Sequence, residues 1–204
     1  MLNKKGAMFG LDARIALAIF GALSVISGAA LYSAVQEAKT IHRVASVSEA
    51  IKAFEAYYLD TGEIIKEGKK GSGFLNIISL IEDSGVAGWK GPYLPFEVLL
   101  PDDGVTYPSL NFPFGSNCSA SGTGNMLRFI GKTNTNGLGT DYILELKCIN
   151  KPTAEGITKK LSNKDLSDVL ITGNYYSPYD SDKKIAFFDR SGDYILYYVV
   201  MTLK

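Results

Sequence analysis

An uncharged apolar run from Ile15 to Val35, IALAIFGALSVISGAALYSAV, limits what this chain can fold into. As an α-helix the run would be about 31 Å long, which matches the hydrocarbon thickness of a bilayer. Lys4 and Lys5 precede it, and positive residues favour the cytoplasmic side of a membrane. The run therefore predicts one transmembrane helix with a cytoplasmic N-terminus. The alternative is a cleaved secretory signal peptide, which would have a shorter apolar stretch.

The helix-forming sequence continues past the apolar run without a Gly or Pro until Gly62. Apolar residues recur there at intervals of three and four, which predicts an amphipathic helix. We expect a single helix, apolar all round over 8–35 and amphipathic over 36–61. Charged residues such as Arg43 lie largely off the apolar face. That face comprises Ile41, Val44, Val47 or Ser48, Ile51, Phe54 and Tyr58.

The membrane half of this helix is rich in Gly, Ala and Ser. Small side chains let helices approach closely in an apolar medium, and a lone anchor has no need of them. Ser24 and Gly28 form a small-xxx-small pair, a pattern that is also common by chance. The composition favours contacts between helices.

Beyond Gly62 the sequence is typical of β-structure. It predicts a short second helix over 74–83, loop-rich segments at 108–125 and 151–180, and a hairpin connection at 190–193. The expected fold class is α+β, a small antiparallel sheet packed on the amphipathic half of the long helix. The expected strands cover 126–132, 141–149, 184–189 and 194–203.

Only two cysteines occur, Cys118 and Cys148, and the single histidine, His42, is distant from both in sequence. A zinc site would need more nitrogen or sulfur ligands. In an extracytoplasmic domain a Cys118–Cys148 disulfide is the natural interpretation, with two free buried thiols as the alternative.

The charge balance and the motifs favour a structural role over a catalytic one. Lys plus Arg and Asp plus Glu both number 21, so no basic excess indicates nucleic acid as a partner. The sequence contains no G-x-S-x-G, no HExxH and no Gly-rich phosphate loop. We therefore expect no enzyme activity, and an anchored enzyme using carboxylates is an unsupported alternative.

Three features together resemble a type IV pilin-like protein, nearest to the major pseudopilins of type II secretion. They are the short basic start MLNKKGA with its long helix, YYLDTG at 57–62 and GWKGPYL at 88–94. The resemblance covers about residues 1–94 and implies a pilin-like fold. Within the last motif, Trp89 and Tyr93 are expected to pack a loop rather than to bind a sugar or a base.

The resemblance also implies a leader peptide, residues 1–7, removed by prepilin peptidase. The cut would fall between Ala7 and Met8, with Gly6 or Gly10 as alternative sites. Ala7 replaces the Gly that the family usually has before the cut.

Cleavage before Met8 would make Asp12 the fifth residue of the mature chain, where the family usually has Glu. An unpaired carboxylate is costly inside an apolar filament core, so we expect Asp12 to pair with the new α-amine of a neighbouring subunit. Arg14 is the competing partner, but residues two apart point to different helix faces. A further alternative is that both residues only mark the membrane boundary.

The function implied is that of a subunit polymerising through its N-terminal helix into a type IV pilus or a type II secretion pseudopilus. Its partners would be copies of itself, other pilin-like subunits, prepilin peptidase and the inner-membrane assembly platform. The subunit would cross the bacterial inner membrane once, with 62–204 periplasmic, before joining a filament. Major and minor subunits both stay open, and the alternative function is a single-pass, membrane-anchored periplasmic binding or sensor module.

Calcium is the one cofactor for which the sequence offers residues. Asp180, Asp182, Asp189 and Asp193 cluster in turn-forming sequence. Hard oxygen ligands suit Ca²⁺, and major pseudopilins bind calcium in a C-terminal loop. The alternative is that these are ordinary turn aspartates.

Overall fold

The chain divides into two compact units, residues 1–39 and 40–204. One helix, α1 (Lys5–Thr61), contributes residues to both. The computed structural model describes residues 5–68, 71–95, 98–99, 109–111, 126–133, 139–171, 184–190 and 192–204.

In the first unit α1 has no apolar face that the protein itself buries. Every described side chain from Gly10 to Val35 is exposed, and Leu17 and Phe20 are each 70% exposed. Among the residues that the structure describes, α1 is the one helix whose length and apolar composition would allow it to cross a membrane. The helix begins at Lys5, so its backbone includes part of the predicted leader.

In the second unit α1 buries one face. The predicted face was rotated relative to the observed one: Ile41 is half-exposed, whereas Arg43, expected off the face, is buried. The helix packs against both the sheet and a second helix, so the buried surface is wider than one apolar stripe. Its buried residues are Thr40, Arg43, Ser46, Val47, Ala50, Ala53, Phe54 and Tyr57.

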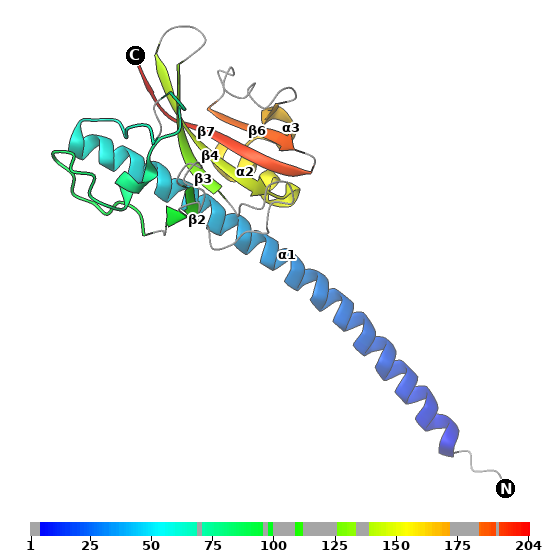
Figure 1. The fold of residues 1–204 in the computed structure, drawn as a ribbon. Helices are drawn as coiled ribbons and strands as arrows, with labels where there is room; N and C mark the ends of the chain where they lie inside the picture. Colours follow the sequence, from blue (N-terminus) through cyan, green and yellow to red (C-terminus); the bar gives the residue numbers. More distant parts are fainter. Residues whose placement is uncertain are drawn as a thin grey trace. The chain divides into compact units, whose positions relative to one another are not determined.

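A mixed sheet in the order β1-β2-β3-β4-β7-β6-β5 forms the rest of the framework. In Figure 1 the strands β3, β4, β7 and β6 lie side by side. Neighbours pair antiparallel, except that β5 pairs parallel with β6. The strands are β1 (Val98–Leu99), β2 (Ser109–Asn111), β3 (Met126–Thr133), β4 (Thr140–Ile149), β5 (Leu170–Ile171), β6 (Ile185–Arg190) and β7 (Asp193–Leu203).

The four long strands confirm the sequence prediction, and the β6–β7 hairpin pairs Arg190 with Asp193. The expected α+β class is compatible with this structure, but the expectation of a small antiparallel sheet was wrong, because the sheet is larger and one pair of strands is parallel. Three further strands extend the sheet, and each has only two or three residues. Strands that short carry no alternating pattern from which to predict them.

The prediction that 151–180 is loop-rich was also wrong, because α2 (Lys151–Ser162) begins there. The Asn150 side chain caps this helix by accepting the Thr153 N–H at 3.1 Å. Asn163, with φ of 53°, ends it in the left-handed conformation. The short helix α3 (Leu166–Val169) follows directly.

The predicted helix over 74–83 is much shorter than expected. Only the 3₁₀ helix η1 (Ile77–Leu80) forms there. Leu75, just before it, instead donates its N–H to Phe129 O in β3 at 3.0 Å, so the start of this segment pairs with β3.

The hydrophobic core lies between the sheet, α1 and α2. The Phe54 ring of α1 stacks on Phe129 of β3 with ring centroids 4.9 Å apart. Ala154 and Ile157 of α2 are completely buried in the same cluster. Between them, Gly156 permits a close crossing, because a Cβ at this position would lie 2.6 Å from Thr40 Cγ2. α2 is therefore in direct contact with the first turn of α1 in the second unit.

The opposite face of β4 carries a buried carboxylate. The Glu145 side chain is fully buried, and Arg128 on the paired strand β3 contacts it at 2.7 Å. Lys147 also contacts this carboxylate, at 3.2 Å. Two cations offset the cost of burying one anion, which ties β3 to β4 in register.

Candidate functional site

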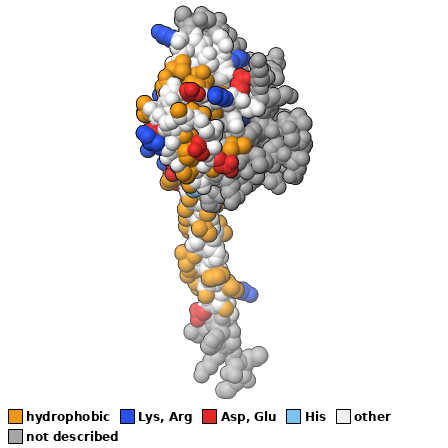
Figure 2. Space-filling view, turned by 60° about the vertical axis from the view of Figure 1, so that its left-hand side comes forward, with side chains coloured by type: hydrophobic (Ala, Val, Ile, Leu, Met, Phe, Trp, Pro, Cys, Tyr) orange, Lys and Arg blue, Asp and Glu red, His pale blue; other side chains and the backbone are white. Residues whose placement is uncertain are grey.

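The exposed apolar surface of α1 is the first candidate site. On the face that Figure 2 shows, this helix carries hydrophobic side chains and little charge. Exposed large side chains include Ile15, Phe20, Ile26 and Leu31. A contiguous apolar surface of this kind is stable in water only when lipid or another protein covers it.

Asp12 and Arg14 lie at the N-terminal end of this surface, and both side chains are exposed. They form no ion pair with each other, although both belong to the described residues. Positions two apart on a helix diverge by about 200°, which accounts for the separation. The carboxylate of Asp12 therefore faces outward, and its pairing with a neighbouring subunit stays a prediction.

The predicted processing residues lie in the first turns of α1. Gly6, Ala7 and Met8 belong to its backbone, and a Cβ at Gly10 would meet no atom within 4 Å. The choice of cleavage site stays a prediction.

The YYLDTG and GWKGPYL motifs, 30 residues apart, meet at the C-terminal end of α1. Lys90 Nζ lies 2.9 Å from Asp60 Oδ1. The Tyr93 hydroxyl donates to Asp60 Oδ2 at 3.1 Å and accepts the Lys90 N–H at 3.0 Å. The Tyr93 ring also packs edge-on against Tyr57 of α1, with centroids 5.9 Å apart. We call these four residues the motif clamp.

Two neighbouring residues of the second motif support the clamp. The Trp89 indole N–H donates to Ser79 O at 2.8 Å, and its ring packs edge-on against Tyr93. Gly88 has φ of +87° and approaches the Asp60 carbonyl so closely that a Cβ would collide with it. The predicted packing role of Trp89 and Tyr93 is confirmed.

The clamp has a defined charge state. The hydrogen bond from the Lys90 ammonium, joined by that from the Tyr93 hydroxyl, lowers the pKa of the Asp60 carboxyl. The same contact raises the pKa of Lys90. Both groups are therefore charged at neutral pH and hold the loop after residue 88 to the end of α1.

Cys148 is buried near the end of β4, at a position with φ of 62°, and is disulfide-bonded. Its predicted partner, Cys118, lies outside the residues that the structure describes. The Cys118–Cys148 pairing stays a prediction.

The calcium prediction is covered only in part by the described residues. Asp189 and Asp193 lie at the β6–β7 hairpin, and Asp189 Oδ1 accepts the Gly192 N–H at 3.0 Å. This bond is what an ordinary turn aspartate makes. Asp180 and Asp182 lie outside the described residues. Among those described, no three His, Cys, Asp or Glu side chains group as a metal site would require.

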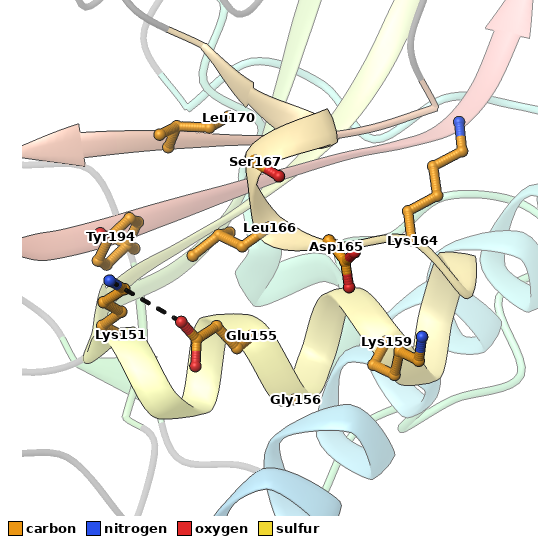
Figure 3. Close-up of a pocket in the computed structure, with 10 residues that line it drawn as sticks. All are labelled: Lys151, Glu155, Gly156, Lys159, Lys164, Asp165, Leu166, Ser167, Leu170 and Tyr194. Carbon is orange, nitrogen blue, oxygen red and sulfur yellow. Dashed lines mark ion pairs between the residues drawn. The ribbon is translucent and has the colours of Figure 1, made fainter.

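A groove between α2, α3 and β7 was not predicted from the sequence. It measures about 660 Å³, and its residues are drawn in Figure 3. Leu166, Leu170 and Tyr194 supply its apolar surface, and burial raises the pKa of the Tyr194 phenol, which is therefore neutral. Lys151, Lys159 and Lys164 supply positive charge. The Asn150 cap and Pro152 were the signals that could have revealed α2, and with it this groove.

Comparison with known proteins leaves these sites to be interpreted from the chain's own residues. No family model matches the chain, and neither the curated proteins nor the solved structures include a significant match to it.

Proposed function

We propose that this protein is a structural subunit, a pilin or pseudopilin, that polymerises through the N-terminal half of α1. One observation carries the proposal: every described side chain from Gly10 to Val35 is exposed on a helix that is apolar all round. Lipid and copies of the same helix are equally apolar, so either can bury this surface. Transfer of the helix between the two surroundings then costs little, which suits a reversible filament.

The motif clamp supports the proposal independently of the membrane helix. YYLDTG and GWKGPYL carried the resemblance to major pseudopilins, and Asp60 contacts both Lys90 and Tyr93. A direct contact between the two motifs explains why they would occur together in one chain. The clamp ties the end of the assembly helix to the folded unit.

In this function the chain starts in the bacterial inner membrane with its N-terminus in the cytoplasm. Prepilin peptidase removes residues 1–7, and the assembly platform moves the subunit into a periplasmic or extracellular filament. Asp12 then leaves the membrane edge for the filament core. A charged Asp at mid-bilayer costs about 2.5–3.5 kcal/mol, so pairing with the α-amine of Met8 in a neighbour would direct assembly.

The groove between α2 and α3 favours a second candidate function, a membrane-anchored binding module. Its volume, about 660 Å³, falls in the range of small-molecule sites. Such a module would need neither leader cleavage nor an Asp12 partner.

Two measurements separate these functions. The intact mass of the membrane-extracted protein should correspond to a chain beginning at Met8, or at the residue after Gly6 or Gly10. Asp12→Ala should be cleaved and inserted yet yield at least tenfold less sheared or cross-linked filament, whereas Arg14→Ala, its matched control, should assemble. An uncleaved chain, or wild-type filament from Asp12→Ala, would contradict the assembly function.

A further inference from the structure

The groove between α2 and α3 gathers lysines from two separate elements. Lys151 and Lys159 project from α2, and Lys164 follows it in the connection to α3 (Figure 3). Lys164 also borders a neighbouring hollow of about 370 Å³, where Lys184 is the other charged residue. The chain has no net charge, so this gathering does not reflect a generally basic composition.

The carboxylates around the groove pair with only one of its three lysines. Glu155 lies 4.0 Å from Lys151, at the limit of an ion pair. The carboxylate of Asp168 accepts the Asp165 N–H at 3.2 Å, as part of the capping box in which the Asp165 side chain also takes part. Lys159 and Lys164 form no ion pair with any residue that the structure describes. The charges of Lys159 and Lys164 are therefore not balanced by an ion pair among the described residues.

Only a few residues of chain separate the apolar run of α1 from a residue that α2 contacts. Gly156, in the middle of α2, is in contact with Thr40. Thr40 follows Val35, the last residue of that run, by five positions. Even a fully extended chain covers only about 18 Å in five residues, whatever the geometry of the junction. If a bilayer contained the run, Thr40 would lie at most about 18 Å along the chain from the end of its hydrocarbon layer, and the adjoining headgroup layer is about 5–8 Å thick.

The geometry points to a phospholipid-binding surface: Lys159 and Lys164 bind the headgroup phosphates of the same leaflet from which α1 emerges. Leu166 and Tyr194 supply apolar surface for the glycerol region of the lipid. Lysine is a point-charge phosphate ligand, and each lysine beside an anionic membrane strengthens binding severalfold. This inference rests on the membrane insertion of α1 in the proposed function but not on cleavage or assembly.

The test is residue-resolved lysine acetylation of the full chain reconstituted in vesicles. One set of vesicles contains phosphatidylcholine alone, and the other also contains the anionic phosphatidylglycerol. Acetylation of Lys159 and Lys164, measured by mass spectrometry relative to Lys66, should fall about threefold or more in the anionic vesicles. Lys66 is a suitable reference because its side chain is 78% exposed. Added salt, 1 M NaCl, should restore acetylation because it screens surface charge.

Two variants and one added ion sharpen the result. Lys151 lines the same groove and should share this protection. The Lys159→Gln, Lys164→Gln double variant should lose the protection of Lys151 in anionic vesicles, whereas Lys52→Gln, an exposed control outside the groove, should keep it. Equal acetylation in both kinds of vesicle would overturn the inference. So would protection by inorganic phosphate in neutral vesicles that matches the effect of phosphatidylglycerol, because the groove would then be a site for free phosphate.

Flotation of the vesicles separates this inference from the function on which it rests. A chain that floats with both kinds of vesicle but shows no protection loses only the lipid contact. A chain that fails to float with either kind overturns the membrane step of the proposed function, and this inference with it. Protection in a chain that floats would support the lipid contact whatever the outcome of the separate cleavage and filament measurements.

Discussion

The two halves of α1 have similar backbones and opposite surroundings. Between Gly10 and Val35 every described side chain is exposed, although nearly all are apolar. Between Thr40 and Thr61 the helix mixes charged and apolar residues, yet it buries Phe54 and Tyr57 almost completely. Apolar composition alone therefore does not determine burial within the protein. The second half is buried because a sheet and α2 cover it, whereas the first half has no such cover within its unit.

The largest expected effect contrasts two side chains of the second half. Phe54→Ala removes a ring that is 1% exposed and stacked on Phe129, which should lower the free energy of unfolding by about 3–5 kcal/mol. Leu59→Ala, its control, changes a side chain that is 81% exposed and should stay within about 0.5 kcal/mol. Urea unfolding of the full chain in detergent micelles, followed by the fluorescence of the single tryptophan, Trp89, measures both. Equal losses would contradict the assigned burial.

Reduction of the predicted disulfide should destabilise the second unit without affecting the apolar helix. Closing a loop of about 30 residues between Cys118 and Cys148 should contribute roughly 3–4 kcal/mol. Reduction should therefore shift the Trp89 unfolding transition to lower urea and leave vesicle flotation unchanged. Alkylation of the denatured, unreduced chain should label no thiol. Two labelled thiols would exclude the pairing.

A glycine in each environment gives a finer comparison. Gly156→Ala should destabilise the second unit by about 1–3 kcal/mol, because the new methyl group would overlap Thr40. Thr40→Ala in the same chain should recover most of that loss, since it removes the overlapping atoms. Gly28→Ala meets no atom within 4 Å and should leave the Trp89 transition unchanged. If Gly156→Ala lowers the stability of the second unit and Thr40→Ala restores none of it, the close crossing of α1 and α2 would be refuted.

The smallest expected effect concerns the motif clamp and depends on pH. The folded-state pKa of Asp60 is lowered, so its contribution to stability is present above the unfolded pKa of about 4 and is lost as the pH falls through the folded value. Asp60→Asn should therefore lower the Tm slightly at pH 7, and the difference from wild type should shrink at pH 3. A difference that does not depend on pH would show that the Lys90 contact adds no stability.

The sequence predicted those parts of the fold that repeat a pattern along the chain. An uncharged run identified the first half of α1, and β-rich runs bounded by Gly, Asn and Asp turn residues identified the four long strands. It did not predict that Asp60 would contact Lys90, because no periodicity links positions 30 residues apart. It missed α2, where Lys, Thr and Gly156 leave few apolar residues for a pattern. The groove was missed for the same reason, since its wall depends on that helix.

The place of β7 in the sheet has a consequence for how the protein is made. This strand follows the other described strands in the chain yet lies between β4 and β6, so the sheet is not complete until Asp193–Leu203 has been synthesised. The apolar half of α1, in contrast, precedes every described strand in the chain and is free to enter a bilayer while the strands are still being translated. A premature stop codon that removes Asp193–Leu203 would therefore leave a chain with its apolar helix intact and no strand between β4 and β6.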